Sequence, residues 1–523
     1  MPKTLVDILH GIDYTAGPLM GEIAIRSITT DSRKVEPGSL FVCLQGLVVD
    51  GHDFVEAAAA KGAAAIVANQ GRKDSLNPGH DLPVVWVADT RKIIGDIASA
   101  FYDHPAAGLT LIGLTGTNGK TTTSYILEAV VRAAGGVPGV IGTINYRYGG
   151  REVPATFTTP EPLELQRLLR EMADHGVSHV IMEVSSHALA MYRIQGLRFD
   201  AALFTNLTRD HLDFHQDMES YYQAKKSLFT DYLQGRGAAV ITIDDAGDET
   251  AAWGRRLYAE IAALRHGDEG TILSCGMSAD HDISVSNHVF SLSATTGTIM
   301  VRGEAFDLSS NLVGAFNLKN ILGAVGVAAG LGLDPTVIAR GLAAPIVVPG
   351  RLEKVSSSTS PSQSGPAVFV DYAHTPDALQ NVLTTLRQLS PQRLIVVFGC
   401  GGDRDPGKRQ MMGEIAGRLA DVVIITADNS RSESPEAIMA EIERGLLAAG
   451  KKIMGNQAPS ASGYLTLSSR SEAIARAIAL AHEQDLILIS GKGHETYQIS
   501  TTGTIFFDDR LEAAQCLYHE MPH

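Results

Sequence analysis

The sequence is poor in cysteine, and its four cysteines do not form a pattern. Cys43, Cys275, Cys400 and Cys516 are scattered over 523 residues, and no two of them form a Cys-x-x-Cys pair. A disulfide framework and a zinc knuckle both need a recognisable cysteine spacing, so neither is expected.

Basic charge and long apolar runs are also scarce. The chain carries 43 lysines and arginines against 58 acidic residues, a formal net charge of -15. This balance argues against a general affinity for nucleic acid or anionic lipid, although a local site can still bind an anion. No apolar run is long enough to span a bilayer, and the N-terminus lacks a signal-peptide pattern. We expect a cytoplasmic protein with no nucleic-acid or membrane partner.

The composition and the order of the apolar runs predict three α/β domains. Hydrophobic residues make up 45% of the chain, which is enough for large buried cores. Short strand-like runs fill residues 1–107, and strand-like runs alternate with helical patterns in 108–345 and again in 346–523. Such alternation is typical of parallel sheets covered by helices. We expect a central P-loop ATPase-type parallel sheet and a C-terminal Rossmann-like α/β domain.

The stretch GLTGTNGKTTT predicts a nucleotide site, although the strict phosphate-loop pattern would require a glycine where this chain has Leu114. It follows a strand-like run and precedes a helical pattern, the context in which such loops bind phosphate. Gly116 and Gly119 would let backbone N–H groups converge on phosphate oxygens. Lys120 would supply a positive charge, and the Thr121 hydroxyl could bind magnesium.

Two further apolar runs end in polar residues that could serve this nucleotide site. Glu183 ends one run, and Asn206 to His211 follow another. A carboxylate and an imidazole beside a phosphate loop can hold magnesium and order the reacting phosphate. The alternative is that each residue is a helix cap, a turn former or a structural histidine.

Three apolar runs in the last third of the chain each lead into a polar cluster. RLIVVFG is followed by CGGDRD, DVVIITA by DNSR, and DLILIS by GKGHE. Because ligands bind beyond the carboxyl ends of parallel strands, these clusters are expected to line one crevice. The alternative is that their glycine, aspartate and asparagine residues only form turns.

The ordered motifs resemble the signature of the Mur ligase family. They are T-G-T-N-G-K-T-T, M-E-V-S-S-H, N-L-T-R-D-H-L-D-F-H, Y-x-x-A-K-x-x-L-F, G-x-F-N-x-x-N, V-P-G-R and D-Y-A-H-T-P. G-G-D-R-D, D-N-S-R and G-K-G-H-E are similar to the branch that adds the third residue of the peptidoglycan stem peptide. The resemblance runs from residue 31 to residue 495 and implies that the shorter loop without a glycine at 114 is functional.

The resemblance implies an ATP-dependent ligase that uses Mg²⁺, and we expect a monomer. Its substrates would be UDP-N-acetylmuramoyl-L-alanyl-D-glutamate and meso-diaminopimelate, joined through an acyl phosphate. Three alternatives stay open: the same ligase using L-lysine, a related ligase such as a folylpolyglutamate synthase, and a catalytically silent nucleotide-gated binding protein. The D-N-S-R and G-K-G-H-E pair argues against the second of these, and intact residues of the nucleotide site argue against the third.

The resemblance also assigns residues to ATP and metal. The phosphate-loop contacts would be Gly116, Thr117, Asn118, Gly119, Lys120, Thr121 and Thr122. Further nucleotide contacts, around a domain junction, would be Asn317, Arg351, Asp371 and His374. Metal ligands would be Thr121, Glu183, His211 and Lys225, and the catalytic set would be Lys120 with the last three of these.

Only the resemblance assigns Lys225 to the catalytic site. It implies that this lysine is carbamylated and that the carbamate binds a second magnesium ion. From the residues alone, Lys225 and Lys226 indicate a solvated helix face.

The remaining assignments concern the two other substrates. The UDP-linked substrate would contact Ser32, Thr158, Thr159, Ser185 and Arg193. Diaminopimelate would contact Arg404, Asp428, Asn429, Ser430, Arg431, Gly491 and Glu495.

Arg431 is expected to select diaminopimelate, which differs from lysine by one carboxylate that a guanidinium can bind with two hydrogen bonds. Glu495 would accept the distal ammonium. Relatives usually read D-N-P-R, and Ser430 replaces the proline, which predicts looser positioning with unchanged specificity. The alternative is that Arg431 only pairs with Glu433 or Glu436 on the surface.

Overall fold

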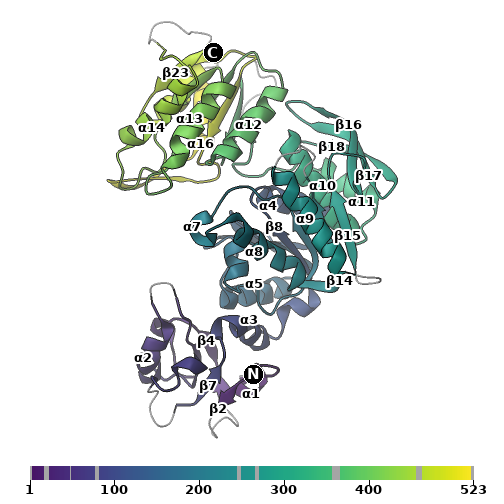
Figure 1. Cartoon of the computed structure of the whole chain (residues 1–523), viewed down its shortest axis with the longest axis vertical. Coiled ribbons are helices and arrows are strands. Elements are labelled where there is room, and N and C mark those ends of the chain that lie inside the picture. Colours follow the sequence, from purple (N-terminus) through teal and green to yellow (C-terminus); the bar gives the residue numbers. More distant parts are fainter. Residues whose placement is uncertain are drawn as a thin grey trace. The chain divides into compact units, whose positions relative to one another are not determined.

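The structure is a computed structural model that describes residues 3–16, 23–46, 49–76, 82–243, 249–265, 270–355, 365–454 and 462–519. Figure 1 shows the helices and strands of the chain. The chain divides into two compact units. The first comprises 1–284, 300–304 and 322–341, and the second comprises 285–299, 305–321 and 342–523. The predicted α/β fold class is confirmed, while the predicted boundaries near residues 107 and 345 stay predictions.

The first unit opens with a small five-stranded sheet. Its order is β2 (Thr15–Ala16), β7 (Val84–Val87), β6 (Ala65–Asn69), β5 (Ser39–Val42) and β4 (Ser27–Thr29). The last four strands are parallel and β2 is antiparallel to β7. The helices with this sheet are α1 (Leu5–Ile8), α2 (Val55–Ala60) and α3 (Thr90–Phe101). The β-branched and aliphatic side chains of β5 and β6 are buried on both faces, as expected for parallel strands covered by helices.

The large sheet, most of whose strands lie in the first unit, positions the predicted nucleotide site. Its order is β11 (Arg151–Pro154), β10 (Asn145–Tyr148), β9 (Pro138–Ile141), β12 (His179–Glu183), β8 (Thr110–Thr115), β13 (Phe199–Phe204), β14 (Leu233–Thr242) and β15 (Thr271–Cys275). The order continues through β16 (Ile283–Phe290), β17 (Thr295–Val301) and β18 (Glu304–Ser310). From β9 to β15 the strands are parallel, so the polar residues that follow β8, β12 and β13 lie at one edge.

Helices follow β8, β11, β12, β13, β14 and β18 along the chain. They are α4 (Lys120–Ala133), α5 (Pro162–Asp174), α6 (Ser186–Ala190), α7 (Leu212–His215), α8 (Met218–Thr230), α9 (Glu249–Leu264), α10 (Ala315–Gly330) and α11 (Pro335–Ala343). In α4, the buried face includes Ile126, Leu127, Val130 and Val131, which recur every three to four residues. Gly135, with φ of +80°, directly follows the end of the helix.

The C-terminal sheet lies within the second unit. Its order is β19 (Glu353–Val355), β20 (Ala367–Asp371), β24 (Leu486–Ser490), β21 (Leu394–Phe398), β22 (Val422–Ile425) and β23 (Gly463–Thr466). All but β19 are parallel, and β21, β22 and β24 are the three apolar runs predicted to be strands. The helices are α12 (Pro376–Gln388), α13 (Gly407–Leu419), α14 (Pro435–Ala448), α15 (Arg470–Leu480) and α16 (Asp509–His519). An antiparallel hairpin of β25 (Tyr497–Ser500) and β26 (Gly503–Phe506) follows β24.

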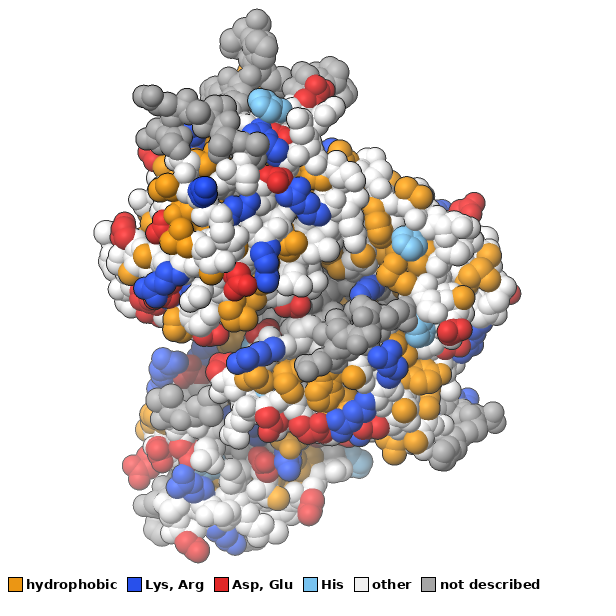
Figure 2. Space-filling view, turned by 45° about the horizontal axis from the view of Figure 1, so that its top comes forward, with side chains coloured by type: hydrophobic (Ala, Val, Ile, Leu, Met, Phe, Trp, Pro, Cys, Tyr) orange, Lys and Arg blue, Asp and Glu red, His pale blue; other side chains and the backbone are white. Residues whose placement is uncertain are grey.

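Two surface properties bear on the sequence-based expectations. None of the helices in the described part of the chain is long and apolar enough to cross a membrane. On the face seen in Figure 2, basic and acidic side chains are interspersed.

Candidate functional site

The predicted phosphate loop joins β8 to α4, and its two glycines are required by the backbone. Gly116 has φ of +142° and Gly119 has φ of +91°, values that favour glycine. A Cβ atom at Gly116 would also collide with the Thr205 hydroxyl. The glycines predicted to shape the loop therefore do so for steric reasons.

The end of β13 holds this loop in place. Thr205 Oγ1 donates to Asn118 O at 2.6 Å, and Asn206 Oδ1 accepts from Asn118 N at 3.0 Å. Asn206 O accepts from Thr117 N at 2.9 Å. The sequence identified Asn206 only as a polar residue after a strand. In the structure, its hydrogen bonds to Thr117 and Asn118 hold the phosphate loop in place.

Two lysines meet at one carbonyl oxygen of the loop. Lys120 Nζ donates to Gly116 O at 2.7 Å, and Lys225 Nζ donates to the same oxygen at 2.8 Å. Lys225 is only 1% exposed, and burial, with Lys120 nearby, lowers the pKa of Lys225 well below its ordinary value. Lys226 instead pairs with Glu260 on α9 at 2.7 Å. The interpretation of Lys225 as part of a solvated face is wrong, because its side chain points into the core.

Glu183, at the end of β12, accepts hydrogen bonds from two threonines. Its carboxylate accepts from Thr121 Oγ1 at 3.0 Å and from Thr143 Oγ1 at 2.9 Å. It also accepts from the Thr143 amide at 3.0 Å, and a Cβ atom at Gly142 would collide with it. Thr143 was missed by sequence reasoning, and its one signal is that it closely follows strand β9.

The donor types around Glu183 suit magnesium. Among the described residues, no group of three or more His, Cys, Asp or Glu side chains could hold a metal ion. A threonine hydroxyl and a carboxylate are nevertheless the hard oxygen ligands that Mg²⁺ prefers, and Mg²⁺ usually completes its shell with water and substrate phosphates. Thr121 and Glu183 fit such a partial shell.

His211 lies in a group of rings at the start of α7. Its ring centroid is 4.8 Å from that of His187 and 6.1 Å from that of Tyr221. Burial lowers the pKa of His211, although Asp210 opposes the shift. The imidazole is therefore mainly neutral near pH 7, the form that binds metal ions.

The residues predicted to hold the sugar-peptide end of the substrate gather behind Glu183. Thr159 Oγ1 donates to Glu183 O at 2.8 Å and accepts from Ser185 N at 3.0 Å. Arg193 Nη1 donates to Thr159 O at 3.1 Å, and the Thr158 and Thr143 hydroxyls are 3.1 Å apart. The structure thus brings four of the five predicted residues together.

The fifth, Ser32, belongs to the small N-terminal sheet region. It begins the 3₁₀ helix Ser32–Lys34, and Lys61 Nζ donates to its carbonyl oxygen at 3.1 Å.

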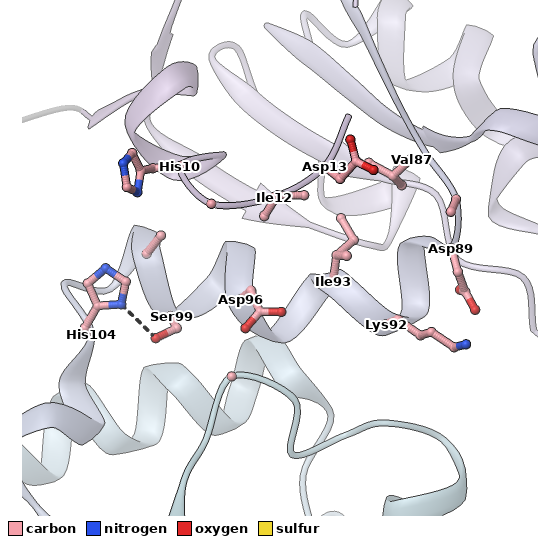
Figure 3. A pocket seen from close by; sticks show the side chains of 14 residues that line it. His10, Ile12, Asp13, Val87, Asp89, Lys92, Ile93, Asp96, Ser99 and His104 are labelled. Carbon is pink, nitrogen blue, oxygen red and sulfur yellow. Dashed lines mark hydrogen bonds between the residues drawn. The ribbon is translucent and has the colours of Figure 1, made fainter. Parts of the chain in front are cut away.

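A cavity of about 500 Å³ opens beside α3 at the carboxyl end of β7 (Figure 3). His10, Asp13, Lys92, Asp96 and His104 are among its lining residues. None of the residues predicted to bind a substrate or metal lines this cavity.

In the second unit, the V-P-G-R, D-Y-A-H-T-P and G-K-G-H-E segments are in contact. Asp371 accepts from the backbone amides of Leu352 at 2.6 Å and of Ala373 at 2.7 Å. The Arg351 guanidinium lies 4.6 Å from the centroid of the Tyr372 ring. A Cβ atom at Gly350 would collide with the backbone of the G-K-G-H-E segment.

Two further residues predicted to contact ATP also lie in the second unit. Asn317, 2% exposed, donates to Val313 O at 2.9 Å near the start of α10. The His374 ring Nδ1 is 2.9 Å from Tyr372 O. The assignment of these residues to ATP stays a prediction.

The polar clusters after β22 and β24 meet as expected. Asn429 Nδ2 donates to Glu495 Oε2 at 2.9 Å. Gly491 has φ of +119°, and a Cβ atom there would lie 2.6 Å from Asp428 Oδ2. Lys492, fully buried, lies 3.3 Å from Asn429 Oδ1 and 3.4 Å from Glu495 Oε2. Sequence reasoning missed Lys492, although it lies inside the G-K-G-H-E motif.

Arg431 connects this cluster to the one after β21. Its Nη1 donates to Gly402 O at 2.8 Å, while Ser430 beside it is buried. The proposed surface partners are engaged elsewhere, because Glu433 binds Arg409 at 2.8 Å and Glu436 binds Ser434 at 2.7 Å. The structure therefore contradicts the alternative in which Arg431 only pairs with Glu433 or Glu436 on the surface.

Arg404 is exposed, and its side chain, like that of Arg431, lies near Gly401. A Cβ atom at Gly401 would lie 3.0 Å from Arg431 Nη1 and 3.9 Å from Arg404 Cγ. Arg404 Nη1 donates to the neighbouring Asp403 O at 3.2 Å. The two arginines predicted to meet the amino acid come from different segments, after β21 and after β22, and both lie near Gly401.

The carboxylates of Asp428 and Glu495, which follow β22 and β24, differ in their electrostatic environment. Burial raises the pKa of Glu495, and Lys492 only partly opposes the shift. Burial also opposes ionisation of Asp428, but Arg470 and Lys492 outweigh it, so the pKa of Asp428 lies below its ordinary value.

Three family models cover the chain in sequence order. Residues 24–102 match the catalytic domain of the Mur ligase family, 114–328 match the Mur ligase middle domain, and 350–493 match the Mur ligase glutamate ligase domain. The chain is also 43% identical to the UDP-N-acetylmuramoyl-L-alanyl-D-glutamate--2,6-diaminopimelate ligase of Geobacter metallireducens, over 94% of each chain. This chain belongs to the Mur ligase family.

Other Mur ligases agree with this assignment. The ligase of the same name from Geobacillus kaustophilus is 43% identical, over 94% of this chain and 95% of that protein. A solved structure of a ligase with that name superposes with a TM-score of 0.70 at 30% identity, covering 99% of both chains. The family predicted from the motifs is confirmed.

Proposed function

We propose that this Mur ligase joins meso-diaminopimelate to UDP-N-acetylmuramoyl-L-alanyl-D-glutamate at the expense of ATP. The observation that carries the proposal is that Arg431 and Glu495 both contact Asn429, the first at its backbone carbonyl and the second at its side-chain amide. A guanidinium and a carboxylate in one crevice suit the carboxylate and the ammonium at the far end of diaminopimelate. The relatives that bear this activity in their names support the same substrate.

The proposed reaction begins at the phosphate loop. A carboxylate oxygen of the UDP-linked dipeptide attacks the γ-phosphorus of ATP, the bond to the β–γ bridging oxygen breaks, and ADP leaves. The amine of the incoming amino acid then attacks the acyl carbon and loses a proton, and inorganic phosphate departs. Lys120, the loop amides and the N-terminus of α4 would bind the phosphates and stabilise the charge that develops.

Magnesium would be held by Thr121 and Glu183, and when bound it neutralises phosphate charge. Thr143 would keep the Glu183 carboxylate oriented, and Thr159 would fix the strand end beneath it. His211, as a neutral imidazole, is the proposed ligand of a second ion.

Lys225 is proposed to be carbamylated. In a buried site next to Lys120, an uncharged amine is favoured over a second ammonium. Its nitrogen can attack CO₂, form a C–N bond and release a proton to water, which leaves an anionic carbamate. That anion would balance the positive charge at the phosphate loop.

An assay with purified protein tests the proposal. UDP-N-acetylmuramoyl-L-alanyl-D-glutamate, ATP and Mg²⁺ are offered with meso-diaminopimelate, L-lysine or L-glutamate, and phosphate release and product mass are measured. We expect ligation of meso-diaminopimelate, with L-lysine used far less. A preference for lysine would support the first alternative. Ligation of glutamate in a parallel assay that offers a folate in place of the UDP-linked dipeptide would support the second, and ATP binding without turnover would support a silent binding protein.

Monomeric state and a cytoplasmic location stay predictions. Size-exclusion chromatography with light scattering tests the first.

A further inference from the structure

The loop that carries the proposed selectivity residues has an unusual backbone. Arg431 has φ of +53°, in the left-handed region that residues other than glycine rarely adopt. Ser430, which precedes it, has no ring to restrict its φ. A loop of this kind keeps one conformation only if surrounding groups hold it.

The hairpin of β25 and β26 supplies such groups at three points. Ile499 O accepts from the Arg431 amide at 3.2 Å, and Ile499 N donates to Asn429 Oδ1 at 2.9 Å. The side chain of Gln498 donates from Nε2 to Asp428 O at 3.3 Å. Residues 498 and 499 therefore contact three of the four residues of the D-N-S-R loop.

The register of the hairpin explains why Ile499 is available for these bonds. Ile499 lies opposite Thr504, and its amide and carbonyl bond to the loop on the other side. In an antiparallel pair, residues that do not exchange hydrogen bonds with each other direct their backbone groups outward. Strand β25 thus lies between β26 and the loop, and it binds the loop much as an edge strand binds an added strand.

The same contact fixes the orientation of the Asn429 amide. Because Oδ1 accepts from Ile499 N, Nδ2 is directed at Glu495 Oε2, 2.9 Å away. An amide has one acceptor and one donor end, so the shorter bond from Ile499 N, together with the 3.3 Å bond from Lys492 Nζ to the same Oδ1, determines which end faces Glu495. The hairpin therefore influences both the arginine and the carboxylate proposed to bind the far end of diaminopimelate.

We propose that the β25–β26 hairpin is a positioning element of the amino-acid site, acting through the backbone of Ile499 on Asn429 and Arg431. The inference rests on the proposed function, because it assumes that these residues bind the incoming amino acid. The hairpin does not touch the amino acid in this proposal; it sets the geometry of the groups that do.

Proline at position 499 tests the proposal, since it removes the N–H that bonds to Asn429 while leaving the ladder to β26 intact. Ile499→Ala is the matched control, because it removes the side chain and keeps both backbone groups. Thr504→Pro is a second control, because it places proline opposite Ile499 on the strand that faces away from the loop.

Steady-state KM values for all three substrates are the readout. We expect Ile499→Pro to raise the KM for meso-diaminopimelate about tenfold, with the KM values for ATP and the UDP-linked dipeptide nearly unchanged. Both controls should stay within about twofold of the wild type. An unchanged amino-acid KM, an equal rise for all three substrates, or the same effect from Thr504→Pro would overturn the proposal.

Gln498→Ala keeps the test decisive if circular dichroism shows that the proline variant does not fold. Loss of the bond to Asp428 O should raise the KM for diaminopimelate about threefold, and no change would overturn the proposal. Failure of the proposed function looks different, because wild-type protein would then not ligate diaminopimelate. If the wild type ligates it and the hairpin variants match the wild type, only the positioning proposal fails.

Discussion

The phosphate loop and the proposed amino-acid crevice are built in different ways. The loop is one continuous stretch whose shape depends on glycine backbone angles and on hydroxyl and amide groups from β13. The crevice combines short segments that follow β21, β22 and β24, far apart in the chain. Its charged side chains bind one another, as Lys492 does between Asn429 and Glu495.

This difference predicts different consequences of mutation. In the phosphate loop, Lys120 donates to two backbone carbonyl oxygens, those of Gly116 and Thr117. In the crevice, removal of one charged group alters the partners of the others, and buried unpaired groups are costly. We therefore expect variants of the phosphate loop to lower kcat and variants of the crevice to change the KM for the amino acid.

The largest effect is expected for Lys120→Ala. Its ammonium would contribute directly to phosphate charge stabilisation, so kcat should fall by about a thousandfold or more. The melting temperature should change little, because Lys120 is half-buried and its ammonium donates to backbone carbonyl oxygens, those of Gly116 and Thr117. Phosphate release and differential scanning fluorimetry provide the two measurements. Near-normal activity would refute the nucleotide assignment.

Lys225 and Lys226 form a matched pair on α8. Lys225→Ala removes a buried amine beside Gly116 O and should reduce kcat by on the order of a few hundredfold. Added formate or acetate should restore part of the activity if the missing group is a carbamate. Lys226→Ala removes a pair with Glu260 that is partly exposed, so activity should stay near that of the wild type. Equal small effects at both positions would contradict the carbamate proposal.

The sequence predicted the parts of the molecule that local patterns determine. Strands β21, β22 and β24, the glycines of the phosphate loop and the apolar face of α4 all follow from short-range rules. The contact between the polar clusters that follow β22 and β24 could also be predicted, because parallel strands end at the same edge of a sheet.

Contacts made across the fold could not be predicted in this way. The burial of Lys225 depends on how α8 packs against the phosphate loop. The sequence around Lys225 instead indicates a solvated helix face. Thr143 contacts Glu183 only because β9 lies beside β12. The bond from Ile499 to Asn429 joins residues 70 positions apart, and no motif encodes it.

Arg431→Ala should change amino-acid recognition more than catalysis. Loss of a charge-assisted pair with the distal carboxylate should reduce kcat/KM for meso-diaminopimelate by on the order of a hundredfold. L-Lysine lacks that carboxylate, so its kcat/KM should fall much less. Arg404→Ala provides the comparison, and we expect a smaller loss because Arg404 is exposed. An equal loss for both amino acids in the Arg431 variant would show that the arginine does not select.

The smallest effect concerns pH and Glu495. Its carboxylate must be ionised to accept the distal ammonium, and burial raises its pKa above the ordinary value. As pH falls from neutral, Glu495 should therefore gain a proton earlier than an exposed glutamate, whose pKa is about 4.3. The KM for diaminopimelate should rise by up to about tenfold on this acidic side.

Two neighbours of Glu495 should not produce this pH dependence. The lowered pKa of Asp428 keeps it ionised, and burial lowers the pKa of His494 to about 4, which keeps the imidazole neutral in the same range. Glu495→Gln should raise the KM at neutral pH and flatten its rise between pH 7 and pH 5, because the amide does not titrate. The KM for lysine, which carries the same distal ammonium, should follow the same acidic rise in the wild type. A KM that is independent of pH in the wild type, or an unchanged profile in the glutamine variant, would remove Glu495 from the proposed binding of the ammonium.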